Sequence, residues 1–257
     1  MKYIPEYEVV SLKAHSLKNV LVIPVINEGQ RLHDLLAKIQ LLELPNIIDI
    51  VVVDGGSTDG SVGIDLLRDY GVSSILFKKG LGKLSAQLLC AYDFVLKKDH
   101  SCVLTIDGNG KDDPSTIPSF ISSISAGYDF VQASRFVPGG YYENTPLIRL
   151  IAVRGIHAPL LSFASGFRWT DSTQGYRAYS RRLLTDPVVD IFRPIFNSYE
   201  LLAYLSYIAP KLGFKCIETP TSRCYPNGPV PTKISKFGGS FELLVTLYKA
   251  CTGKFNK

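Results

Sequence analysis

The sequence contains few cysteines, one methionine and one tryptophan among its 257 residues. Its 5 cysteines are odd in number, and no two of them form a C-x-x-C pair. This spacing predicts neither a disulfide framework nor a structural zinc site. The cysteines are Cys90, Cys102, Cys216, Cys224 and Cys251. Most of them stand within apolar stretches, which is typical of buried, reduced thiols in a cytosolic protein.

A large excess of charge of one sign is also absent. Lys and Arg number 28 and Asp and Glu 23, which gives a net charge of +5 and a pI of about 8.8. An excess of this size favours anionic partners, such as phosphate-bearing small molecules or anionic membrane surfaces. It is smaller than the excess typical of nucleic-acid-binding proteins, and no helix-turn-helix, RRM or zinc-finger motif is present, so we expect no nucleic-acid partner.

No segment reaches the roughly 18 uninterrupted apolar residues of a membrane-spanning helix. The nearest approach, residues 146–167, carries Arg149, Arg154 and His157. Near the N-terminus, charges and Pro5 interrupt the chain before an apolar run can form, so we expect no signal peptide. These absences predict a cytoplasmic protein, and any membrane contact is expected to be peripheral, on the cytoplasmic face.

Short β-branched runs alternate with segments of helical period through the first half of the chain. The expected strands are residues 20–26, 47–53, 72–77, 102–106 and 128–136, and the expected helices are 31–44, 61–70, 84–97 and one opened by Pro114 and Pro118. This alternation predicts an α/β fold with a mostly parallel, doubly wound sheet. With no linker or repeat, we expect a single domain over 1–257, with a lead (1–19) and two halves (20–136 and 137–257).

Polar residues follow the expected strands where each strand ends. Asn27 and Glu28 follow the first strand, Asp54 the second, and Asp107 the fourth. In open parallel sheets, ligands bind outside the carboxyl ends of the strands. The sequence therefore predicts a ligand site at this edge.

Two glycine-containing turns are candidates for this chemistry. Asp107 and Asn109 could offer two oxygen ligands to Mg²⁺ or Mn²⁺ from one short loop, although Asp107 and Asp112 could instead cap turns. The run 80–83 (GLGK) fits neither G-x-G-x-x-G nor the Walker pattern. Lys83 therefore either reaches a diphosphate or is an exposed lysine at a helix-entry turn.

Several motifs together resemble family 2 glycosyltransferases of the GT-A fold. They are residues 24–28 (PVINE), 53–59 (VDGGSTD), 80–83 (GLGK) and 105–114 (TIDGNGKDDP), continued by 133–140 (ASRFVPGG) and 171–179 (DSTQGYRAY). Within the family, the chain is most similar to the dolichyl/polyprenyl-phosphate mannose or glucose synthase group. The similarity covers roughly residues 20–184 and implies an enzyme that binds a nucleotide-diphosphate-sugar.

The resemblance implies roles for the residues that match the family's nucleotide site. Pro24, Ile26 and Glu28 would line the base and ribose site, with Glu28 accepting hydrogen bonds from ribose hydroxyls. Asp54 would recognise the base. Lys83 would reach the diphosphate from the glycine-containing turn.

The resemblance also implies a metal and phosphate site. Asp107 and Asn109 would stand where the family's metal-binding D-x-D motif stands, with Gly108 allowing close backbone approach and Lys111 nearby. Arg135 matches a family arginine near the phosphates, where a guanidinium holds oxygens bidentately.

Two later basic residues match the group more loosely. Arg223 and Lys233 fall where a late basic residue often closes over the diphosphate or the acceptor phosphate.

The chain departs from the family pattern at two points. Asn109 replaces the second Asp of D-x-D, which removes a negative charge and should weaken divalent-ion binding. No carboxylate pair marks a general base, and Asp171 is the best remaining candidate, although it could instead orient Arg177 or cap a turn. A phosphate acceptor is already ionised at pH 7 and needs little base catalysis, so the departure favours a lipid phosphate.

These observations predict an inverting glycosyltransferase whose catalytic residues are Asp107, Arg135 and Asp171. The first-choice acceptor is a polyprenyl or dolichyl phosphate. A hydroxyl of a cell-surface or lipid-linked glycan is the alternative acceptor, and a sugar-nucleotide nucleotidyltransferase or an inactive nucleotide-sugar binder is the alternative from another class.

Residues 146–167 and the histidines are less informative. Residues 146–167 could lie among lipid headgroups, although a core-packing or homodimer helix pair is the favoured interpretation for most of the segment. The histidines, His15, His33, His100 and His157, lack metal-ligand spacing, and we expect them to face solvent or pack.

Overall fold

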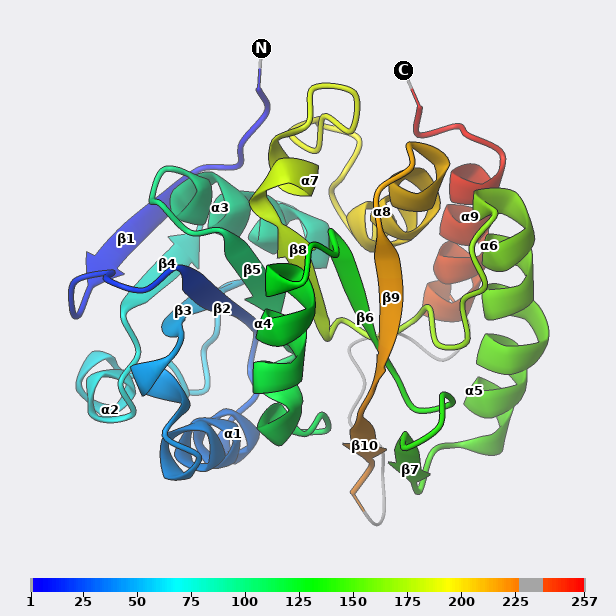
Figure 1. Cartoon of the computed structure of the whole chain (residues 1–257). Coiled ribbons are helices and arrows are strands. Elements are labelled where there is room, and N and C mark those ends of the chain that lie inside the picture. Colours follow the sequence, from blue (N-terminus) through cyan, green and yellow to red (C-terminus); the bar gives the residue numbers. More distant parts are fainter. Residues whose placement is uncertain (1, 227–237, 257) are drawn as a thin grey trace.

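The structure, a computed structural model, describes residues 2–226 and 238–256, with side chains omitted for 238–241. Its main feature is an eight-stranded sheet in the order β1-β4-β3-β2-β5-β8-β6-β9 (Figure 1). The parallel strands are β2 (Asn19–Val25), β3 (Asp49–Asp54), β4 (Ser74–Lys78), β5 (Cys102–Thr105), β6 (Phe130–Ser134) and β9 (Cys216–Pro220). The predicted mostly parallel α/β sheet is confirmed.

Two antiparallel strands were not predicted. β1 (Tyr7–Ser11) lies within the lead and pairs with β4 at the edge of the sheet. Its side chains are exposed or half-buried, so it lacks the buried apolar run that reveals an interior strand. β8 (Arg177–Ser180) is inserted between β5 and β6 and has only 4 residues.

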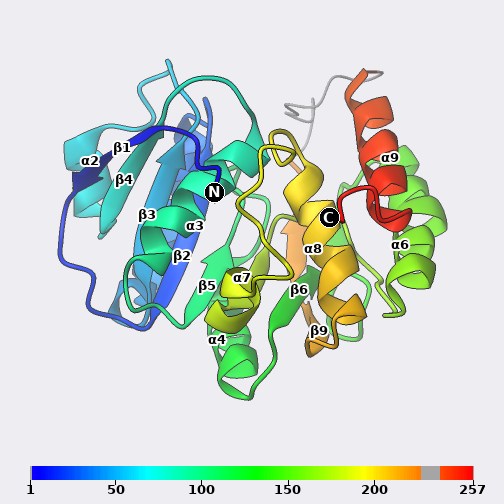
Figure 2. The same ribbon diagram turned by 90° about the horizontal axis from the view of Figure 1, so that it is seen from above.

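Helices cover both faces of the sheet because alternate residues of the central strands point to opposite faces. In β2, Val20 and Val22 pack on the side of α3 (Leu84–Leu96), while Leu21 and Ile23 pack on the side of α1 (Gln30–Leu41). α2 (Ile64–Asp69) and α4 (Ile117–Ser125) share the α1 face. Figure 2 shows α3 and α8 (Glu200–Lys211) on the opposite face.

The second half adds three further features. α7 (Arg181–Thr185) follows β8, whereas the short 3₁₀ turns Leu44–Asn46 and Pro114–Thr116 belong to the first half. β7 (Tyr141–Glu143) and β10 (Ser222–Cys224) form a separate two-stranded parallel sheet. α9 (Gly238–Cys251) packs against α8 and α6 (Ala158–Ser165).

The segment expected to pack in the core is an exposed helix. α5 (Leu147–Ile151), a π-helical turn (Ala152–His157) and α6 run on as one helix, Leu147–Ser165, with 17% of its most apolar window buried. The core-packing interpretation is therefore wrong for most of it. By length and composition alone, this helix could cross a membrane, since its most apolar window has a mean hydropathy of 1.4. This differs from the prediction of no membrane-spanning segment, which counted only uninterrupted apolar residues.

The cysteines partly match the prediction. All 5 are free thiols, and Cys90 and Cys102 are buried. Cys216 and Cys251 are half-buried. Cys224 is exposed, because it lies on the short surface strand β10.

Candidate active site

The carboxyl ends of β2, β3, β5 and β6 meet along one edge of the sheet. Asp54 ends β3, Asp107 follows β5, and Arg135 follows β6. β10 places Arg223 beside the same edge, since Arg223 bridges to Asp112 just after the β5 turn. The structure thus brings together groups that are up to about 170 residues apart in the sequence.

Two loops after β2 and β3 are hydrogen-bonded to each other. The backbone amide of Asn27 donates to Ser57 Oγ at 2.9 Å, and Asn27 Oδ1 accepts from the Thr58 amide at 2.7 Å. Asn27 has a φ of 48°, a conformation that Asn tolerates better than most residues. Asp54, 4% exposed, accepts from the amide and hydroxyl of Ser57 at 2.9 and 2.6 Å. This loop pair forms a preorganised wall beside Asp54.

The predicted base and ribose residues lie on the same wall. Pro24 is half-buried in β2, and Ile26, just beyond the strand, is 38% exposed. Glu28 is buried, and its Oε2 is paired with the Arg31 guanidinium, 2.8 Å from Nη2. Their roles toward a nucleotide stay predictions.

Gln87 was not identified from the sequence. From α3, its Nε2 donates to the carbonyls of Val25 at 2.8 Å and Val53 at 2.9 Å, which closes the ends of β2 and β3. A Cβ at Gly55 would lie 2.9 Å from this nitrogen, so a side chain there would displace the Gln87 amide from these carbonyls. A polar residue within a helix gives no sequence signal for such a contact.

The Asp107 turn is shaped by two close approaches. A Cβ at Gly108 would lie 2.6 Å from Val25 Cγ1, and a Cβ at Gly175 would lie 2.3 Å from Asp107 Oδ1. Any side chain at Gly175 would therefore displace the carboxylate. Asn109 Nδ2 donates to Asp107 Oδ2 at 3.4 Å, while Asn109 Oδ1 accepts from the Lys111 amide at 3.2 Å.

Arg223 joins the Asp107 turn through a buried ion pair. Its Nη1 lies 2.7 and 2.5 Å from the two oxygens of Asp112, and its Nη2 lies 3.3 Å from Asp107 Oδ2. Arg223 is 6% exposed and Asp112 4% exposed. The sequence assigned Asp112 a capping role, whereas the structure makes it the partner of Arg223.

Tyr225 is a second residue that the sequence did not identify. Lys111, Arg149 and Arg223 all lie over its ring, at 5.0, 5.7 and 5.8 Å from the centroid, and Arg149 Nη1 donates to its hydroxyl at 2.7 Å. Burial opposes the effect, but Arg223 and Arg149 lower the pKa of Tyr225. Burial, reinforced by Arg223, lowers the pKa of Lys111. We call Lys111, Arg149, Arg223 and Tyr225 the basic cluster.

Arg135 and Asp171 form a buried bidentate pair. Arg135 Nε donates to Asp171 Oδ2 at 2.6 Å and Nη2 to Oδ1 at 3.0 Å, and both residues are at most 3% exposed. Gln174 also donates to Asp171. Arg135 Nη1 is buried with no hydrogen-bond partner among the described residues. These contacts fix the orientation of Arg135.

Asp171 therefore orients Arg135 rather than Arg177. Arg177, 1% exposed, donates instead to backbone carbonyls, Gln174 O at 2.8 Å and Leu202 O at 2.8 Å, and is a structural residue. Glu218 on β9 holds the start of this loop by accepting from the Asp171 amide at 2.9 Å. A general-base role for Asp171 stays a prediction.

Lys83 is paired with a carboxylate of α9. Its Nζ lies 2.9 Å from Glu242 Oε2 on α9, and this hydrogen bond raises the pKa of Lys83. Gly82 is required at this turn, since its φ is 106° and a Cβ would lie 2.5 Å from Asn197 Oδ1. Lys233 lies outside the described residues.

The donor set at Asp107 fits a hard divalent cation. Asp107 is partly exposed, with 23% of its side chain accessible, and its described contacts fall on Oδ2. Carboxylate and amide oxygens are the ligands that Mg²⁺ and Mn²⁺ prefer. The positive charges of Lys111 and Arg223 offset the negative charges of Asp107 and Asp112. A metal cation alone is therefore attracted only weakly to this turn, and its attraction increases when an anion binds beside it.

A family model provides the first comparison with known proteins. The model described as "Glycosyl transferase family 2" matches residues 20–186. That range contains every motif of the Asp54, Asp107 and Arg135 edge and ends before β10.

Among curated proteins, the chain is similar to enzymes named for lipid-phosphate substrates. It is 28% identical over 206 residues to polyprenol monophosphomannose synthase of Mycolicibacterium smegmatis, covering 79% of this chain and 76% of that protein. It is 32% identical over 159 residues to dolichyl-phosphate hexose transferase of Haloferax volcanii, covering 61% of this chain and 64% of that protein. The chain thus spans less than two thirds of the second relative.

Among solved structures, the chain is similar to glucosyl-3-phosphoglycerate synthase of Mycobacterium tuberculosis. That enzyme was solved with Mn²⁺, UDP and phosphoglyceric acid; the TM-score is 0.64 at 18% identity, covering 92% of this chain and 79% of that one. At this identity the likeness establishes the shared GT-A fold.

His157 gives this region a testable pH dependence. Its Nδ1 lies 2.7 Å from Ser172 Oγ, which ties the Leu147–Ser165 helix to the loop of Asp171. Burial lowers the pKa of His157 from 6.5 to about 4. Since the unfolded chain takes up this proton first, the stability that neutral His157 gives is complete above pH 6.5 and is lost as the pH falls toward 4.

We predict that His157→Asn flattens this acid dependence. Between pH 7.5 and pH 5, His157 should account for about 2 kcal/mol of the wild-type loss in unfolding free energy, and the variant should lose that much less. Urea unfolding at both pH values measures it, with His33→Asn as the matched control. An unchanged pH slope in His157→Asn, or an equal change in the control, contradicts the assignment.

Proposed function

The chain belongs to glycosyl transferase family 2, and from this premise we propose that it transfers a sugar, with inversion, from a nucleotide-diphosphate-sugar to a polyprenyl phosphate. The observation that carries the choice of acceptor is the basic cluster, which lies between the Asp107 turn and the exposed Leu147–Ser165 helix. A lipid phosphate needs both features: cations for the phosphate and an apolar surface for the chain.

The donor would lie across the carboxyl edge of the sheet. The wall formed by the loops of Asn27 and Ser57 supports a nucleoside beside Asp54, with Pro24, Ile26 and Glu28 as lining residues. The diphosphate would then extend toward Asp107 and Arg135. The unpaired Nη1 of Arg135 supports a contact with a phosphate oxygen, because a buried cationic donor gains most from an anionic partner.

Mg²⁺ or Mn²⁺ would be held by Asp107, with Asn109 as the second ligand. When bound, the ion would neutralise charge on the departing diphosphate. Because Asn109 is neutral and two cations face Asp107, the ion should bind more tightly together with the diphosphate than alone. The solved relative with Mn²⁺ and UDP supports the same pairing in this fold.

The acceptor phosphate would lie at the basic cluster. Arg149 belongs to the exposed helix yet donates to Tyr225, so it connects the apolar surface to the Asp107 turn. Arg154 lies one turn further along, 5.2 Å above the ring of Phe136, with Arg135 on the same ring at 5.0 Å. A phosphate oxygen is already a nucleophile at pH 7, which fits the burial of Asp171 in an ion pair.

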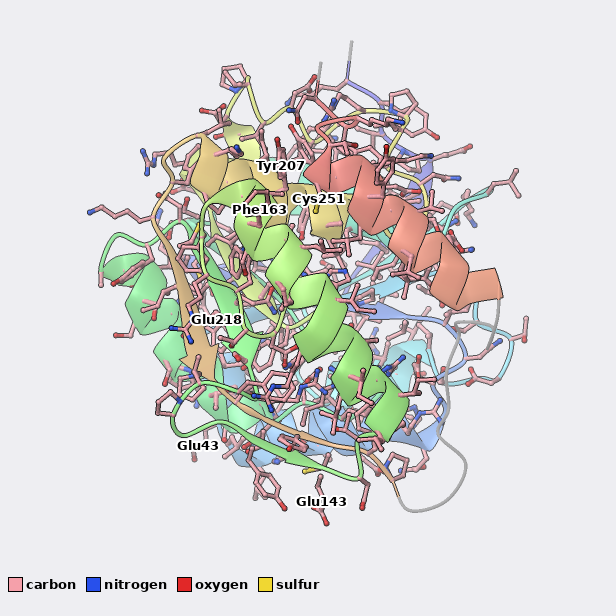
Figure 3. All side chains as sticks on the ribbon, turned by 90° about the vertical axis from the view of Figure 1, so that its right-hand side faces the viewer. Glu43, Glu143, Phe163, Tyr207, Glu218 and Cys251 are labelled. Atoms are coloured by element: carbon pink, nitrogen blue, oxygen red, sulfur yellow. The ribbon has the colours of Figure 1, made fainter. Side chains whose placement is uncertain are left out.

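The exposed helix supports peripheral contact of the protein with a membrane, and we propose that the contact is on the cytoplasmic face of that membrane. Its exposed apolar side chains are Leu147, Ile148, Ile151, Ile156, Leu160 and Phe163, and Leu244 and Tyr248 of α9 are exposed as well. Figure 3 shows the helix and α9 crossing the same face of the molecule, with Phe163 labelled. Flanking arginines suit anionic headgroups. The alternative is that this face joins two copies of the chain in a homodimer, and the vesicle experiment distinguishes that homodimer from membrane contact.

We predict that purified protein with Mg²⁺ or Mn²⁺ glycosylates a short polyprenyl phosphate when given the correct member of a nucleotide-sugar panel. Asp107→Ala should lower kcat by about 100-fold or more, since it removes a charged ligand at the leaving group. Asp113→Ala, which removes the neighbouring carboxylate that pairs with Lys38, is the matched control and should stay active.

Three outcomes contradict the proposal. Transfer only to a saccharide hydroxyl overturns the lipid-phosphate acceptor. Formation of a nucleotide-sugar from a sugar phosphate and a nucleoside triphosphate overturns the transferase. An active, folded Asp107→Ala variant overturns the assignment of Asp107.

We predict that Arg149→Gln raises the KM for polyprenyl phosphate about tenfold and leaves the KM for the nucleotide-sugar unchanged, because it removes one acceptor-side cation. Steady-state kinetics with each substrate varied separately measure the difference. Arg68→Gln, on α2 at the surface, is the control. An equal rise in both KM values would show that Arg149 only supports the fold of the site.

We predict that the double variant Ile148→Asp and Phe163→Asp loses at least about tenfold in affinity for vesicles of phosphatidylcholine and phosphatidylglycerol, since both side chains are exposed and apolar. Co-sedimentation measures the bound fraction, and Leu41→Asp, at an exposed position on α1, is the control. Failure of the wild-type chain to bind vesicles contradicts membrane contact. If the wild-type chain is instead a dimer that the double variant disrupts, the face joins two copies.

A further inference from the structure

Three residues that are distant in the sequence meet at the amino-terminal edge of the sheet, opposite the candidate active site. His15 precedes β2, Asp49 is the first residue of β3, and His100 precedes β5. Asp54 ends the same strand that Asp49 begins, so the two edges are separated by about 16 Å, five residues of extended chain. The cluster is therefore separate from the Asp107 turn.

The ligand atoms of these side chains converge. One nitrogen of each histidine and one oxygen of Asp49 all lie within 4.8 Å of one another. His15 Nδ1 is 3.7 Å from Asp49 Oδ2. The side chains of His15 and Asp49 are 7% and 1% exposed, and His100 is 1% exposed. Three metal-ligating groups thus share a small, enclosed space.

Two buried nitrogens in this space lack a partner. His15 Nδ1 and His100 Nε2 have no hydrogen bond with any of the described residues. A buried polar atom without a partner costs roughly 1–3 kcal/mol, so such atoms usually mark a missing ligand or water. Here the two unpaired atoms belong to adjacent rings, whose centroids are 5.4 Å apart.

The other nitrogen of each ring is held by the protein. His100 Nδ1 lies 2.9 Å from the Leu17 carbonyl, which can only accept, so Nδ1 carries the proton and Nε2 presents a lone pair. His15 Nε2 lies 2.8 Å from Ser74 Oγ. A ligating histidine is typically fixed in this way by a hydrogen bond from its other nitrogen.

Asp49 is oriented in the same manner. Its Oδ2 accepts from the amides of Ser16 and Leu17, both at 3.1 Å, and Ser73 Oγ lies 3.4 Å from its Oδ1. Burial lowers the pKa of His15 and of His100, although Asp49 opposes it, while Lys98 adds to the lowering. The neutral imidazole, which burial favours, is the form that binds a metal.

We propose that His15, Asp49 and His100 form a binding site for a transition-metal ion, with Zn²⁺ as the expected occupant. Two imidazoles and a carboxylate are a ligand set typical of zinc, with water completing a tetrahedron. Ligand atoms around tetrahedral zinc are about 3.4 Å apart, so binding draws the three atoms together by up to about 1.4 Å. The ion would join the N-terminal segment to the starts of β3 and β5.

The experiment uses the full chain carrying Asp107→Ala, so that the active-site turn takes up no ion. After treatment with a chelator, the protein is dialysed against ZnCl₂ and zinc is counted per chain. We expect one zinc per chain and, at a zinc concentration 100 times Kd, a rise in Tm of about 5 to 10 °C. His15→Gln and His100→Gln should each lower the affinity at least about 100-fold.

His33→Gln is the matched control, because His33 lies outside the cluster and should bind zinc as before. Co²⁺ tests the site in the chain that keeps His15, Asp49 and His100. Four-coordinate Co²⁺ absorbs visible light more strongly than six-coordinate Co²⁺, so the spectrum reports the geometry of the bound ion. Lack of zinc uptake, a weak six-coordinate Co²⁺ spectrum, or unchanged affinity in both histidine variants overturns the site. The result is independent of glycosyl transfer.

Discussion

The buried ion pair between Arg223 and Asp112 is the contact on which the candidate active site depends. It joins β10 to the turn that follows β5, and it places the second nitrogen of Arg223 3.3 Å from Asp107. Removing one partner of such a pair leaves a buried charge and costs about 3–5 kcal/mol, so the pair fixes the position of β10. Tyr225, directly after β10, is thereby held over the same turn and gathers Lys111 and Arg149.

Charge balance explains how this edge can accept two anionic substrates. Asp107 and Asp112 offset Arg223 and Lys111 in the free protein, while Asp171 offsets Arg135. A metal and a diphosphate that arrive together add nearly compensating charges, whereas either alone leaves an excess in a partly buried site. Arg149 and Arg154 belong to the exposed helix, where a second phosphate would find cations that the donor does not use.

The sequence predicted the parallel strands β2 to β6 and the position of Asp54 and Asp107, because buried strands appear as β-branched runs and end in polar turns. It did not predict the parallel strand β9, most of which is only half-buried. It did not predict β1, whose exposed edge lacks such a run, or the inserted strand β8, which has only 4 residues. The partner of Asp171 was also missed: the sequence offered Arg177, a neighbour along the chain, whereas the structure supplies Arg135, which lies 36 residues away. Such pairings depend on strand order, which a single sequence does not reveal.

The same limit applies to the histidines, the exposed helix and the acid in the Asp107 turn. His15 and His100 lack metal spacing along the chain and become neighbours only because β3 and β5 both flank β2. The apolar periodicity of residues 147–165 does not reveal whether the apolar face of this helix lies in the core or at the surface. Asp112 appeared as a capping residue because its partner is 111 residues away.

The most direct test of the account is a crystal of the protein with Mn²⁺ and the nucleoside diphosphate of its donor, measured at a wavelength where manganese scatters anomalously. The account predicts a manganese peak bound to Asp107 and to the diphosphate, with the nucleoside beside Asp54 and the guanidinium of Arg135 at a phosphate oxygen. A diphosphate bound elsewhere, or a nucleotide at this edge with no manganese at Asp107, would contradict it.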